Sequence, residues 1–412
     1  MVKKKKVGIG IVGVGPRAET LFPALMDLIE HGEVEIPAIC DVRQDRIDRF
    51  LGIMKEKKLK RPACYLNYHE LLDNPKVEGI IAPTSWNAHL RIARDAMLKG
   101  KYVGIEVGGA SSLDELWELV HASEATGASC MMLENCCYAR NELMVMNMVR
   151  QGLFGELVYC SCGYEHDLRK EFSLDFNPPK ERIIHNLCRN GDLYPTHGLG
   201  PISKILGINR GNRFLTLTSH STKARSMAVG LKELINQSPH FNCGDMITTV
   251  IHCANGENIT MTRSVSLPRP YSRACRVQGT KGIWLEEAGL FCEGVTKTHT
   301  DYDGAGNAYI IPEWTPMDSL YEKYDHPIWR DYKDHITGFH EGMDTLVLRA
   351  FADSIRLHVP TPIDVYDCAA WMCITCLSEE SIAMGGHPVP IPDFTNGKWM
   401  VREPLPGTKW DL

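Results

Sequence analysis

The sequence predicts an α/β protein with an N-terminal doubly wound parallel sheet and a C-terminal α+β domain whose open sheet is mostly antiparallel. Three observations predict this. The 412 residues exceed the ~250–300 residues at which one hydrophobic core stops growing. An apolar run near the start ends in a glycine-rich turn and continues into a helical pattern. After residue 134, alternating and β-branched segments become frequent. We therefore divide the chain into domains 1–134 and 135–412.

The composition excludes several classes of protein. With 44% hydrophobic residues, 23% charged residues and a net charge of −6, the chain is an ordinary globular protein with no global attraction to nucleic acid or anionic membranes. It contains no apolar run of the ~18 residues that a membrane span requires. The lysine-rich start passes straight into the first strand without a cleavage site, and the 15 cysteines are typical of buried thiols in a reducing compartment. We therefore expect a cytoplasmic protein.

The first expected element is the apolar run Lys6–Val12, which is short and dense enough for a strand buried on both faces of a parallel sheet. It ends in Gly13-Val14-Gly15-Pro16-Arg17-Ala18, which fits G-x-G-x-x-G/A, and Glu19–Glu30 follows with helical spacing of its apolar residues. Gly13 permits the tight turn, and Gly15 lets a pyrophosphate approach the backbone at the N-terminus of the helix.

The second expected strand, Val34–Cys40, ends in Asp41. A carboxylate at this position accepts hydrogen bonds from the adenosine ribose diol and repels a 2′-phosphate, so we expect NAD rather than NADP. Strand, glycine turn, helix, strand and terminal acid in this order predict a Rossmann dinucleotide-binding domain.

The alternation of strands and helices continues to the end of this domain. We expect strands at Val77–Ala82, Tyr102–Glu106 and Ser129–Leu133, and helices ending at Glu70–Asn74 and spanning Leu90–Lys99 and Leu113–Thr126. Loops at the carboxyl ends of parallel strands line the ligand crevice, so Trp86 and His89 in the loop 83–89 are candidates for packing near the nicotinamide ribose. Glu134 and Asn135 could contact substrate or nicotinamide, although a capping or edge-solvating role explains each nearly as well.

The stretch Arg189–Pro201 places Tyr194 and His197 three residues apart, close enough to share one face of a helix or tight turn. A phenol and an imidazole beside Gly198 and Gly200 suit proton transfer to and from a small polyol. A capped helix start with a buried, hydrogen-bonded histidine explains the stretch equally well.

In the C-terminal domain we expect strands at Val158–Glu165, Leu215–Ser219, Met246–Cys253, Asn258–Ser266, Ala274–Gln278 and Ile283–Glu286. Asp301–Asn307 is expected to be a surface loop, and His335–Leu357 and Asp367–Ala383 are expected to be helices. We expect no metal site. Cys373 and Cys376 have C-x-x-C spacing, but they lie in an apolar segment with no second ligand pair nearby.

The glycine turn, Glu106 after one strand and Glu134-Asn135 after the next resemble the Gfo/Idh/MocA oxidoreductase superfamily. The resemblance implies a Rossmann domain, a C-terminal domain whose open sheet backs the active site, and a homo-oligomer. Dehydrogenases of that group carry Glu-Lys-Pro with a catalytic lysine, whereas this chain has Glu106-Val107-Gly108. The missing lysine counts against a routine sugar dehydrogenase, because alkoxide chemistry needs a cation or acid there.

Longer stretches resemble glycoside hydrolase family 109, the NAD-dependent α-N-acetylgalactosaminidases, over nearly the whole chain. They are 131–138 (MMLENCCY), 147–157 (NMVRQGLFGEL), 163–169 (GYEHDLR), 189–201, 208–211, 342–350, 362–367 (PIDVYD) and 392–399 (PDFTNGKW). The chain departs from the family pattern at Pro16, Ala88 and Glu181, and between Arg169 and Arg182. These departures leave the identity of the sugar open.

The glycine motif and the resemblance together assign two sets of residues. Those expected at NAD are Gly13, Gly15, Pro16, Arg17, Asp41, Trp86, Asn87, His89, Glu106, Val107 and Asn135. Those expected in the sugar pocket are Glu134, Tyr164, Arg182, Tyr194, His197 and Tyr271. For His166 and His185 we favour a structural role.

The resemblance implies redox-assisted hydrolysis of a glycoside. Hydride leaves sugar carbon 3 for the nicotinamide, a base removes the acidified proton on carbon 2, the leaving group is eliminated, water adds and the hydride returns. We expect His197 to take the proton of the carbon 3 hydroxyl and Tyr164 to act at carbon 2, where a neighbouring Arg182 would favour the phenolate. The alternatives are an NAD-dependent sugar oxidoreductase that releases NADH, and a non-catalytic sensor of NAD or sugar.

Overall fold

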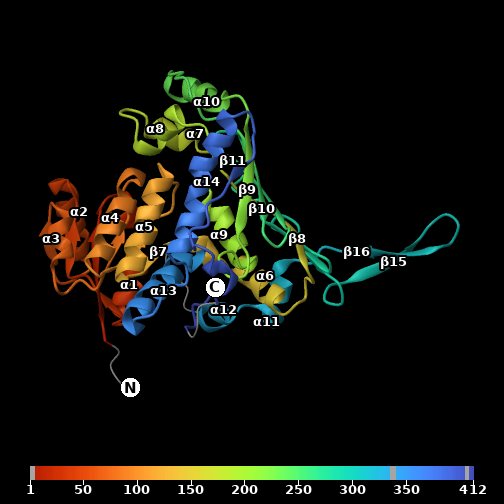
Figure 1. Ribbon diagram of the computed structural model, residues 1–412, viewed down its shortest axis with the longest axis horizontal. Coiled ribbons are helices and arrows are strands. Elements are labelled where there is room, and N and C mark those ends of the chain that lie inside the picture. The colour runs from red at the N-terminus through yellow and green to blue at the C-terminus, as the bar shows by residue number, and fades with distance from the viewer. Residues whose placement is uncertain (1–4, 335–339, 404–407) are drawn as a thin grey trace.

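The computed structural model describes residues 5–334, 340–403 and 408–412. Two sheets organise it (Figure 1). The N-terminal sheet lies on one side with helices α1 to α5, and the C-terminal sheet forms the other half of the molecule. A two-stranded hairpin projects from the C-terminal side. Among the helices of these ranges, none is long and apolar enough to cross a membrane.

The N-terminal sheet is parallel, with the strand order β4-β3-β1-β5-β6-β7. Its strands are β1 (Val7–Val12), β2 (Val34–Glu35, paired with β1), β3 (Ala38–Cys40), β4 (Ala63–Tyr65), β5 (Gly79–Ala82), β6 (Tyr102–Ile105) and β7 (Cys130–Met132). Its helices are α1 (Pro16–Glu30), α2 (Gln44–Glu56), α3 (Tyr68–Leu72), α4 (Trp86–Leu98) and α5 (Leu113–Thr126). The order reverses between β1 and β5, which is where doubly wound sheets bind their ligands.

The predicted Rossmann domain is confirmed, and its differences from the predicted elements are local. The single strand expected at 34–40 is divided into β2 and β3 because Pro37 has no N–H for the ladder. The prediction of a loop at 83–89 is wrong for its second half, because α4 begins at Trp86 and includes His89. Helix α2 was not expected, and α5 has the expected bounds.

The C-terminal sheet has the order β14-β13-β12-β8-β11-β10-β9-β17. Its strands are β8 (Leu157–Glu165), β9 (Phe214–Ser221), β10 (Ile247–Cys253), β11 (Asn258–Ser264), β12 (Arg276–Gly279), β13 (Gly282–Leu285), β14 (Gly289–Cys292) and β17 (Val389–Pro390). Among these strands, only β8 and β11 pair in parallel. The predicted open, mostly antiparallel sheet is therefore confirmed.

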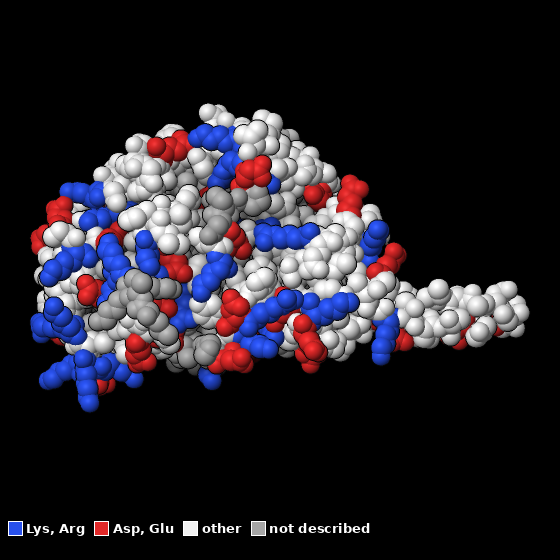
Figure 2. Space-filling model, turned by 90° about the horizontal axis from the view of Figure 1, so that it is seen from below, with Lys and Arg blue, Asp and Glu red and all other residues white. Residues whose placement is uncertain are grey.

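The projecting hairpin consists of β15 (Thr298–Tyr302) and β16 (Ala308–Pro312). The expectation of a loop at 301–307 was wrong at its start, because Asp301 and Tyr302 belong to β15, and only 303–307 form the turn. The hairpin extends well beyond the body of the protein and carries few charges, whereas positive and negative side chains are mixed over the body (Figures 1 and 2).

Helices of the C-terminal half cover both sheets. They are α6 (Arg140–Arg150), α7 (Arg169–Leu174), α8 (Glu181–Cys188), α9 (Thr196–Ile205), α10 (Ser226–Ile235), α11 (Tyr321–Tyr324), α12 (Pro327–Tyr332), α13 (Met343–Leu357) and α14 (Val365–Ala383). Short 3-10 turns lie at η1 (Asn135–Tyr138), η2 (Met317–Leu320), η3 (His340–Gly342) and η4 (Lys398–Met400).

Helix α13 belongs to the C-terminal half of the sequence but packs on the N-terminal domain. It contacts α1, and Arg349 forms a buried ion pair with Asp27 at 2.7 Å. The helix expected to begin at His335 is shorter. Residues His340, Glu341 and Gly342 have positive φ values of 52°, 54° and 87°, so α13 starts at Met343. The first part of that expectation, 335–339, falls outside the described residues.

Candidate active site

A first cavity of about 340 Å³ lies at the carboxyl ends of β1 and β5. Gly13, Gly15, Pro16, Arg17 and Asp41 all line it. Gly13 has a φ of +94°, and a Cβ there would lie 2.7 Å from the Thr84 side chain, so only glycine fits this turn. The turn therefore brings the first strand of the sheet and the loop after β5 together around one crevice.

The same cavity fits the adenosine and pyrophosphate of a dinucleotide. Asp41 is buried at its wall, where its carboxylate accepts hydrogen bonds from the backbone N–H groups of Val14 and Arg43, each at 3.0 Å. These bonds fix an acid next to the glycine turn and leave lone pairs for a ribose diol. At Gly15, an added Cβ would meet only the flexible end of Arg46, at 3.4 Å, so the backbone is open toward the cavity.

A second cavity of about 360 Å³ adjoins the first, and the two share Arg17, Thr84 and Ser85. Trp86, Glu106, Val107 and Asn135 also line it. Because it continues the first cavity toward the C-terminal domain, its residues could hold the nicotinamide half of a dinucleotide. Gly108 has a φ of +147°, and a Cβ there would lie 2.6 Å from the Trp86 indole nitrogen. Gly108 thus allows the Trp86 indole to form one wall of the second cavity.

Arg17 joins the two domains at this second cavity. Its guanidinium donates to Glu106 at 2.7 Å and lies 3.6 Å from Asp344 of α13. Burial opposes its charge, but the carboxylates of Glu106 and Asp344 raise the pKa of Arg17 above its ordinary value. Asp344 also accepts a hydrogen bond from the Asn135 amide at 2.9 Å. An acid from the C-terminal half is therefore fixed among the residues expected at the cofactor.

Three aromatic side chains and an arginine meet on the far wall of the second cavity. The rings of Tyr164 and Tyr194 are 4.5 Å apart, and those of Tyr164 and His197 are 5.7 Å apart. The Arg182 guanidinium donates to the Tyr164 phenol at 3.1 Å and lies 4.8 Å from the centre of the Tyr194 ring. The structure thus brings together four residues that the sequence analysis expected in one sugar pocket.

His197 has a buried carboxylate behind it. Its Nδ1 is 2.7 Å from Glu134, whose side chain is fully buried, and its Nε2 is 3.4 Å from the Tyr194 hydroxyl. Although burial opposes ionisation, His197 and further hydrogen bonds hold the pKa of Glu134 below its usual value. An ionised Glu134 accepts a hydrogen bond from Nδ1–H of His197, which leaves Nε2 as the basic nitrogen on the side of the cavity.

Glycines of the stretch 189–201 explain how this cluster forms. A Cβ on Gly198 would lie 2.6 Å from the backbone nitrogen of Gly163 in β8, and one on Gly200 would lie 3.0 Å from Glu134. Helix α9 can therefore approach β8, which carries Tyr164, and Glu134, which lies two residues after the end of β7. His197 is in the first turn of α9, and Tyr194 precedes that helix, so both side chains reach the cavity.

Tyr194 is partly buried at the wall of the second cavity. Enclosure within the protein raises the pKa of its phenol well above the ordinary value. Tyr194 is therefore a neutral hydroxyl at neutral pH, suited to orienting a ligand rather than removing a proton.

A third cavity of about 690 Å³ lies beyond this cluster. It shares Asn135, Tyr164, His197 and His340 with the second cavity, and Tyr271 lines it. The rings of Tyr271 and Tyr164 are 6.1 Å apart. Tyr164 and His197 thus stand at the boundary between the cavity that continues the dinucleotide crevice and the cavity that leads away from it.

Three of the expected site residues lie elsewhere. His89 is fully buried inside α4, and it lines neither of the first two cavities. Asn87 is exposed and is also not among the lining residues, although its backbone N–H donates to Glu181 at 3.0 Å. Glu134 is covered by His197 and does not line the pocket. Its place is behind the histidine rather than against a ligand.

Several residues at the site were not expected from the sequence. Glu181 of α8 accepts hydrogen bonds from the backbone N–H groups of Trp86 and Asn87 and so caps α4 from the other domain. His166 lies 3.3 Å from the Tyr164 hydroxyl, and Asp344 joins Arg17 and Asn135. The i, i+2 spacing of Tyr164 in β8 and His166 directly after it could have indicated the contact between these two residues. No local pattern indicates the contacts of Glu181 and Asp344, because they cross between domains.

Glu134, Cys136 and His197 place one ligand atom each within 4.8 Å of one another. A metal would have to compete with the 2.7 Å contact between Glu134 and His197, and burial raises the pKa of the Cys136 thiol well above its ordinary value. Since cysteine binds metals as the thiolate, this arrangement favours a hydrogen-bonded pair over a cation site.

Comparison with known protein families gives two matches that together span most of the chain. Residues 7–134 match the model of the oxidoreductase family with an NAD-binding Rossmann fold, and residues 138–401 match the C-terminal domain of glycosyl hydrolase 109. An α-N-acetylgalactosaminidase of Tannerella forsythia is 37% identical, covering 98% of this chain and 90% of that protein. Another, from Shewanella oneidensis, is 38% identical over 98% of this chain and 88% of that protein.

Solved structures with similar folds are oxidoreductases. An NAD-binding oxidoreductase from Klebsiella pneumoniae superposes with a TM-score of 0.70 at 14% identity, covering 94% of this chain and all of that chain. An oxidoreductase from Agrobacterium radiobacter in complex with NAD+, L-tartaric acid and magnesium gives a TM-score of 0.62 at 15% identity, over 94% of this chain and 98% of that one. At this identity the likeness shows a common fold.

Proposed function

Because this chain belongs to glycosyl hydrolase family 109, we propose that it hydrolyses α-N-acetylgalactosaminides or related glycosides with a tightly bound NAD that is recycled in each turnover. It is a glycosidase with an NAD-binding Rossmann domain. The observation that carries the mechanism is the position of Tyr164 and His197, which line both the cavity that continues the dinucleotide crevice and the cavity beyond it.

The first and second cavities would hold the cofactor. Asp41 would bind the adenosine ribose, the turn at Gly13 and Gly15 would bind the pyrophosphate, and Trp86 and Val107 would enclose the nicotinamide. NAD bound in this way supplies a hydride acceptor at sugar carbon 3 and later a hydride donor to the same carbon.

His197 would act on the hydroxyl of carbon 3. Its Nδ1–H is engaged by Glu134, so the neutral ring presents Nε2 as an acceptor. Taking up the hydroxyl proton leaves a cationic ring, which the buried Glu134 carboxylate stabilises at 2.7 Å. The neutral Tyr194 hydroxyl, 3.4 Å from the same nitrogen, would orient the sugar hydroxyl.

Tyr164 would remove the proton of carbon 2 after carbon 3 has become a ketone. The Arg182 cation donates to the phenol oxygen at 3.1 Å and would stabilise negative charge there. The electron pair left on carbon 2 would form a double bond to carbon 1 and expel the leaving group, which takes up a proton. Water would then add its hydroxyl group to carbon 1, a proton would return to carbon 2, and carbon 3 would be reduced to the hydroxyl again. The net reaction is hydrolysis, with no cofactor consumed.

Turnover of an aryl α-N-acetylgalactosaminide by the NAD-loaded protein tests this proposal. We expect release of the aryl alcohol without accumulation of NADH. The absorbance of the aryl alcohol and that of NADH measure the two outcomes. The rival activity, an NAD-dependent sugar oxidoreductase, would accumulate NADH without releasing the aryl alcohol. The His197→Ala variant should lower kcat by about 10²–10⁴-fold, the range of one general acid–base group.

A further inference from the structure

We infer that Glu181 controls the exchange of NAD. By joining helix α8 to the start of α4 beside the second cavity, it keeps that cavity closed, and NAD enters or leaves only when the two helices separate. The inference rests on the proposed function in one respect, because it explains how the cofactor stays bound between turnovers. It gives Glu181 a positioning role rather than a contact with NAD.

The carboxylate of Glu181 binds the N-terminus of α4, and we call this the α8–α4 contact. Its two oxygens accept hydrogen bonds from the backbone N–H groups of Trp86 at 3.1 Å and Asn87 at 3.0 Å. Within the described part of the chain, the Ser85 side chain makes no capping hydrogen bond to α4, whose first turn contains no acid. The N–H groups at the start of a helix attract negative charge, so these two bonds are charge-assisted.

The charge of Glu181 and a ring contact both strengthen this junction. Burial opposes ionisation of Glu181, but His185 and the N–H groups of Asn87 and Trp86 hold the pKa of its carboxyl group below the ordinary value. The centres of the His185 and Trp86 rings are 5.3 Å apart. A residue one turn further along α8 thus also contacts the first residue of α4.

The second cavity lies between the two parts of the chain that the α8–α4 contact joins. Glu106 and Val107 line it from the N-terminal domain, and Glu181 and Arg182 of α8 line it from the C-terminal half. Figure 1 shows α8 extending from the C-terminal half over α4 and α5. The nicotinamide half of a dinucleotide in this cavity would lie between these walls, and the α8–α4 contact opposes their separation.

The other end of α8 is fixed to the C-terminal sheet. Arg263 of β11 is buried and donates to the Asn186 side chain at 2.7 Å. Helix α8 can therefore turn about this end once Glu181 is released. Because Arg182 of the same helix donates to the Tyr164 phenol, this movement would also withdraw Arg182 from the site. The protein that is open for NAD exchange thus lacks the cation beside Tyr164, so exchange and turnover exclude each other.

The α8–α4 contact predicts a kinetic result that a contact with NAD does not. Both of its partners are groups of the protein, so it stabilises the closed arrangement with or without NAD. Weakening it should speed the entry and the release of NAD by similar factors and leave the dissociation constant nearly unchanged. Loss of a residue that contacts NAD would raise the dissociation rate and the dissociation constant together.

Exchange of labelled NAD out of the holoenzyme into excess unlabelled NAD measures the dissociation rate, and equilibrium dialysis of the same holoenzyme measures the dissociation constant. Glu181→Gln keeps one acceptor oxygen and loses the charge. We expect it to raise the rate about tenfold and to change the dissociation constant by less than about threefold. The matched control is Glu233→Gln in α10, an exposed position on the same side of the molecule, which should change neither value (Figure 1).

His185→Ala provides a second variant, because it removes the ring contact and leaves the carboxylate. It should raise the dissociation rate by a smaller factor, again with a nearly unchanged dissociation constant. A rate in Glu181→Gln equal to that in Glu233→Gln would overturn the inference, as would a dissociation constant that rises by the same factor as the rate.

Glycoside cleavage by the same holoenzyme separates this inference from the proposed function. If NAD exchange responds as expected but no glycoside is cleaved, the proposed function fails and the role of Glu181 stands. If glycosides are cleaved but exchange does not respond to Glu181→Gln, the role of Glu181 fails and the proposed function stands. A protein that binds no NAD would overturn both.

Discussion

His197 depends on Glu134 for the orientation and tautomer of its ring. The two groups are 2.7 Å apart, and the carboxylate is fully buried, so we propose that it acts through the histidine rather than on a ligand. Family resemblance identified both residues, but only the fold shows that one stands behind the other. The distinction matters because a positioning residue and a binding residue change different kinetic constants.

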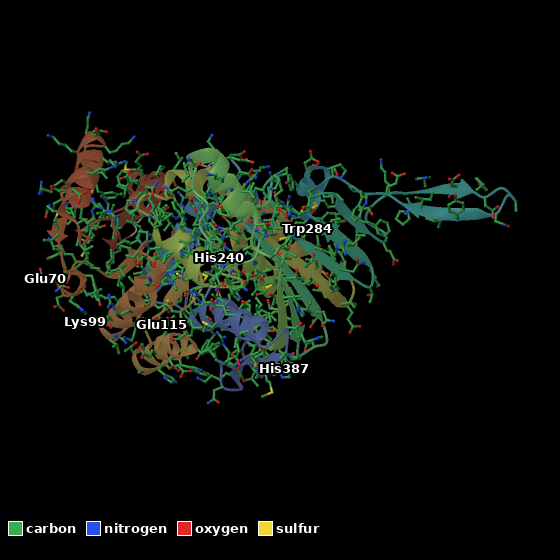
Figure 3. The ribbon with its side chains drawn as sticks, turned by 90° about the horizontal axis from the view of Figure 1, so that it is seen from above. Glu70, Lys99, Glu115, His240, Trp284 and His387 are labelled. Carbon is green, nitrogen blue, oxygen red and sulfur yellow. The ribbon has the colours of Figure 1, made fainter. Side chains whose placement is uncertain are left out.

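We predict that Glu134→Gln lowers kcat by about 10–100-fold with little change in KM, since second-layer partners of this kind have effects of that size. The amide can still accept the Nδ1–H bond, but it no longer compensates the charge of the imidazolium. Steady-state kinetics over a pH series measure the change. Glu70→Gln is the control, because Glu70 is exposed at the outer edge of the N-terminal domain (Figure 3). A rise in KM at constant kcat would instead indicate direct contact with the sugar.

His89 provides a pH prediction. Burial lowers the pKa of its ring to about 4, and neither ring nitrogen has a hydrogen-bond partner among residues 5–334, 340–403 and 408–412. The unfolded chain takes up a proton near pH ~6.5 and the folded chain only near pH 4. The free energy of unfolding therefore falls as the pH drops through this window, by up to about 3 kcal/mol from this group.

Urea unfolding at pH 7 and pH 5 checks this prediction. His89→Phe should be less sensitive to acid than the wild type, and NAD affinity should not change. The sequence pattern predicts instead that His89 touches NAD, in which case the same variant would bind NAD more weakly. His326, whose pKa burial also lowers to about 4, remains in both proteins and contributes equally to each.

Among the elements, the periodicity of apolar residues predicted most strands and helices, but it predicted the ends of these elements less well. Leu113–Thr126 had the predicted bounds because its helix starts at a serine cap and stops at a left-handed glycine. Trp86 was expected in a loop, but it begins α4. The start of this helix is capped by Glu181 of α8, and no local sequence pattern reveals a cap from another element. Helix α13 begins late because three consecutive residues before it have positive φ.

Substitution of Gly198 tests whether close packing against β8 positions α9. An alanine Cβ there would lie 2.6–2.7 Å from backbone atoms of Gly163, and backbone cannot yield as a side chain can. We expect Gly198→Ala to destabilise the protein by about 1–3 kcal/mol and to lower kcat, because His197 moves away from Tyr164.

Thermal unfolding and kcat together measure that effect. The matched control is Gly52→Ala in α2, an exposed helix position where an added Cβ meets nothing within 4 Å. It should stabilise the helix by about 0.5–1 kcal/mol and leave kcat unchanged. Equal behaviour of the two variants would contradict the proposed role of Gly198.

At the scale of the whole molecule, the order of the two domains and the type of each sheet were predictable from the sequence. The strand–turn–helix unit and the acid after the second strand predicted the first domain, and the family resemblance predicted the second. The joining of the domains was not predictable, because Asp344, Glu181 and the Arg349–Asp27 pair connect residues far apart in the chain. Of these residues, Glu181 also lines the second cavity.

The homo-oligomer expected from the superfamily remains a prediction. The hairpin β15–β16 is exposed along its length, with Tyr302, Tyr309 and Ile310 on its surface. A two-stranded hairpin has little stability by itself in water, so a neighbouring subunit would favour its order. We expect light scattering after size-exclusion chromatography to give a multiple of the 46.3 kDa chain mass. A mass of one chain over a range of protein concentrations would contradict this.

We propose that the glycosidic bond breaks by elimination after oxidation at carbon 3, and that Tyr164 removes and returns the proton of carbon 2. The most direct measurement is hydrolysis of an aryl α-N-acetylgalactosaminide in heavy water, followed by NMR of the released sugar. We expect deuterium at carbon 2 of the product. In Tyr164→Phe we expect almost no release of the aryl alcohol and no deuterium at carbon 2. Hydrolysis at the normal rate with the original hydrogen kept at carbon 2 would contradict it.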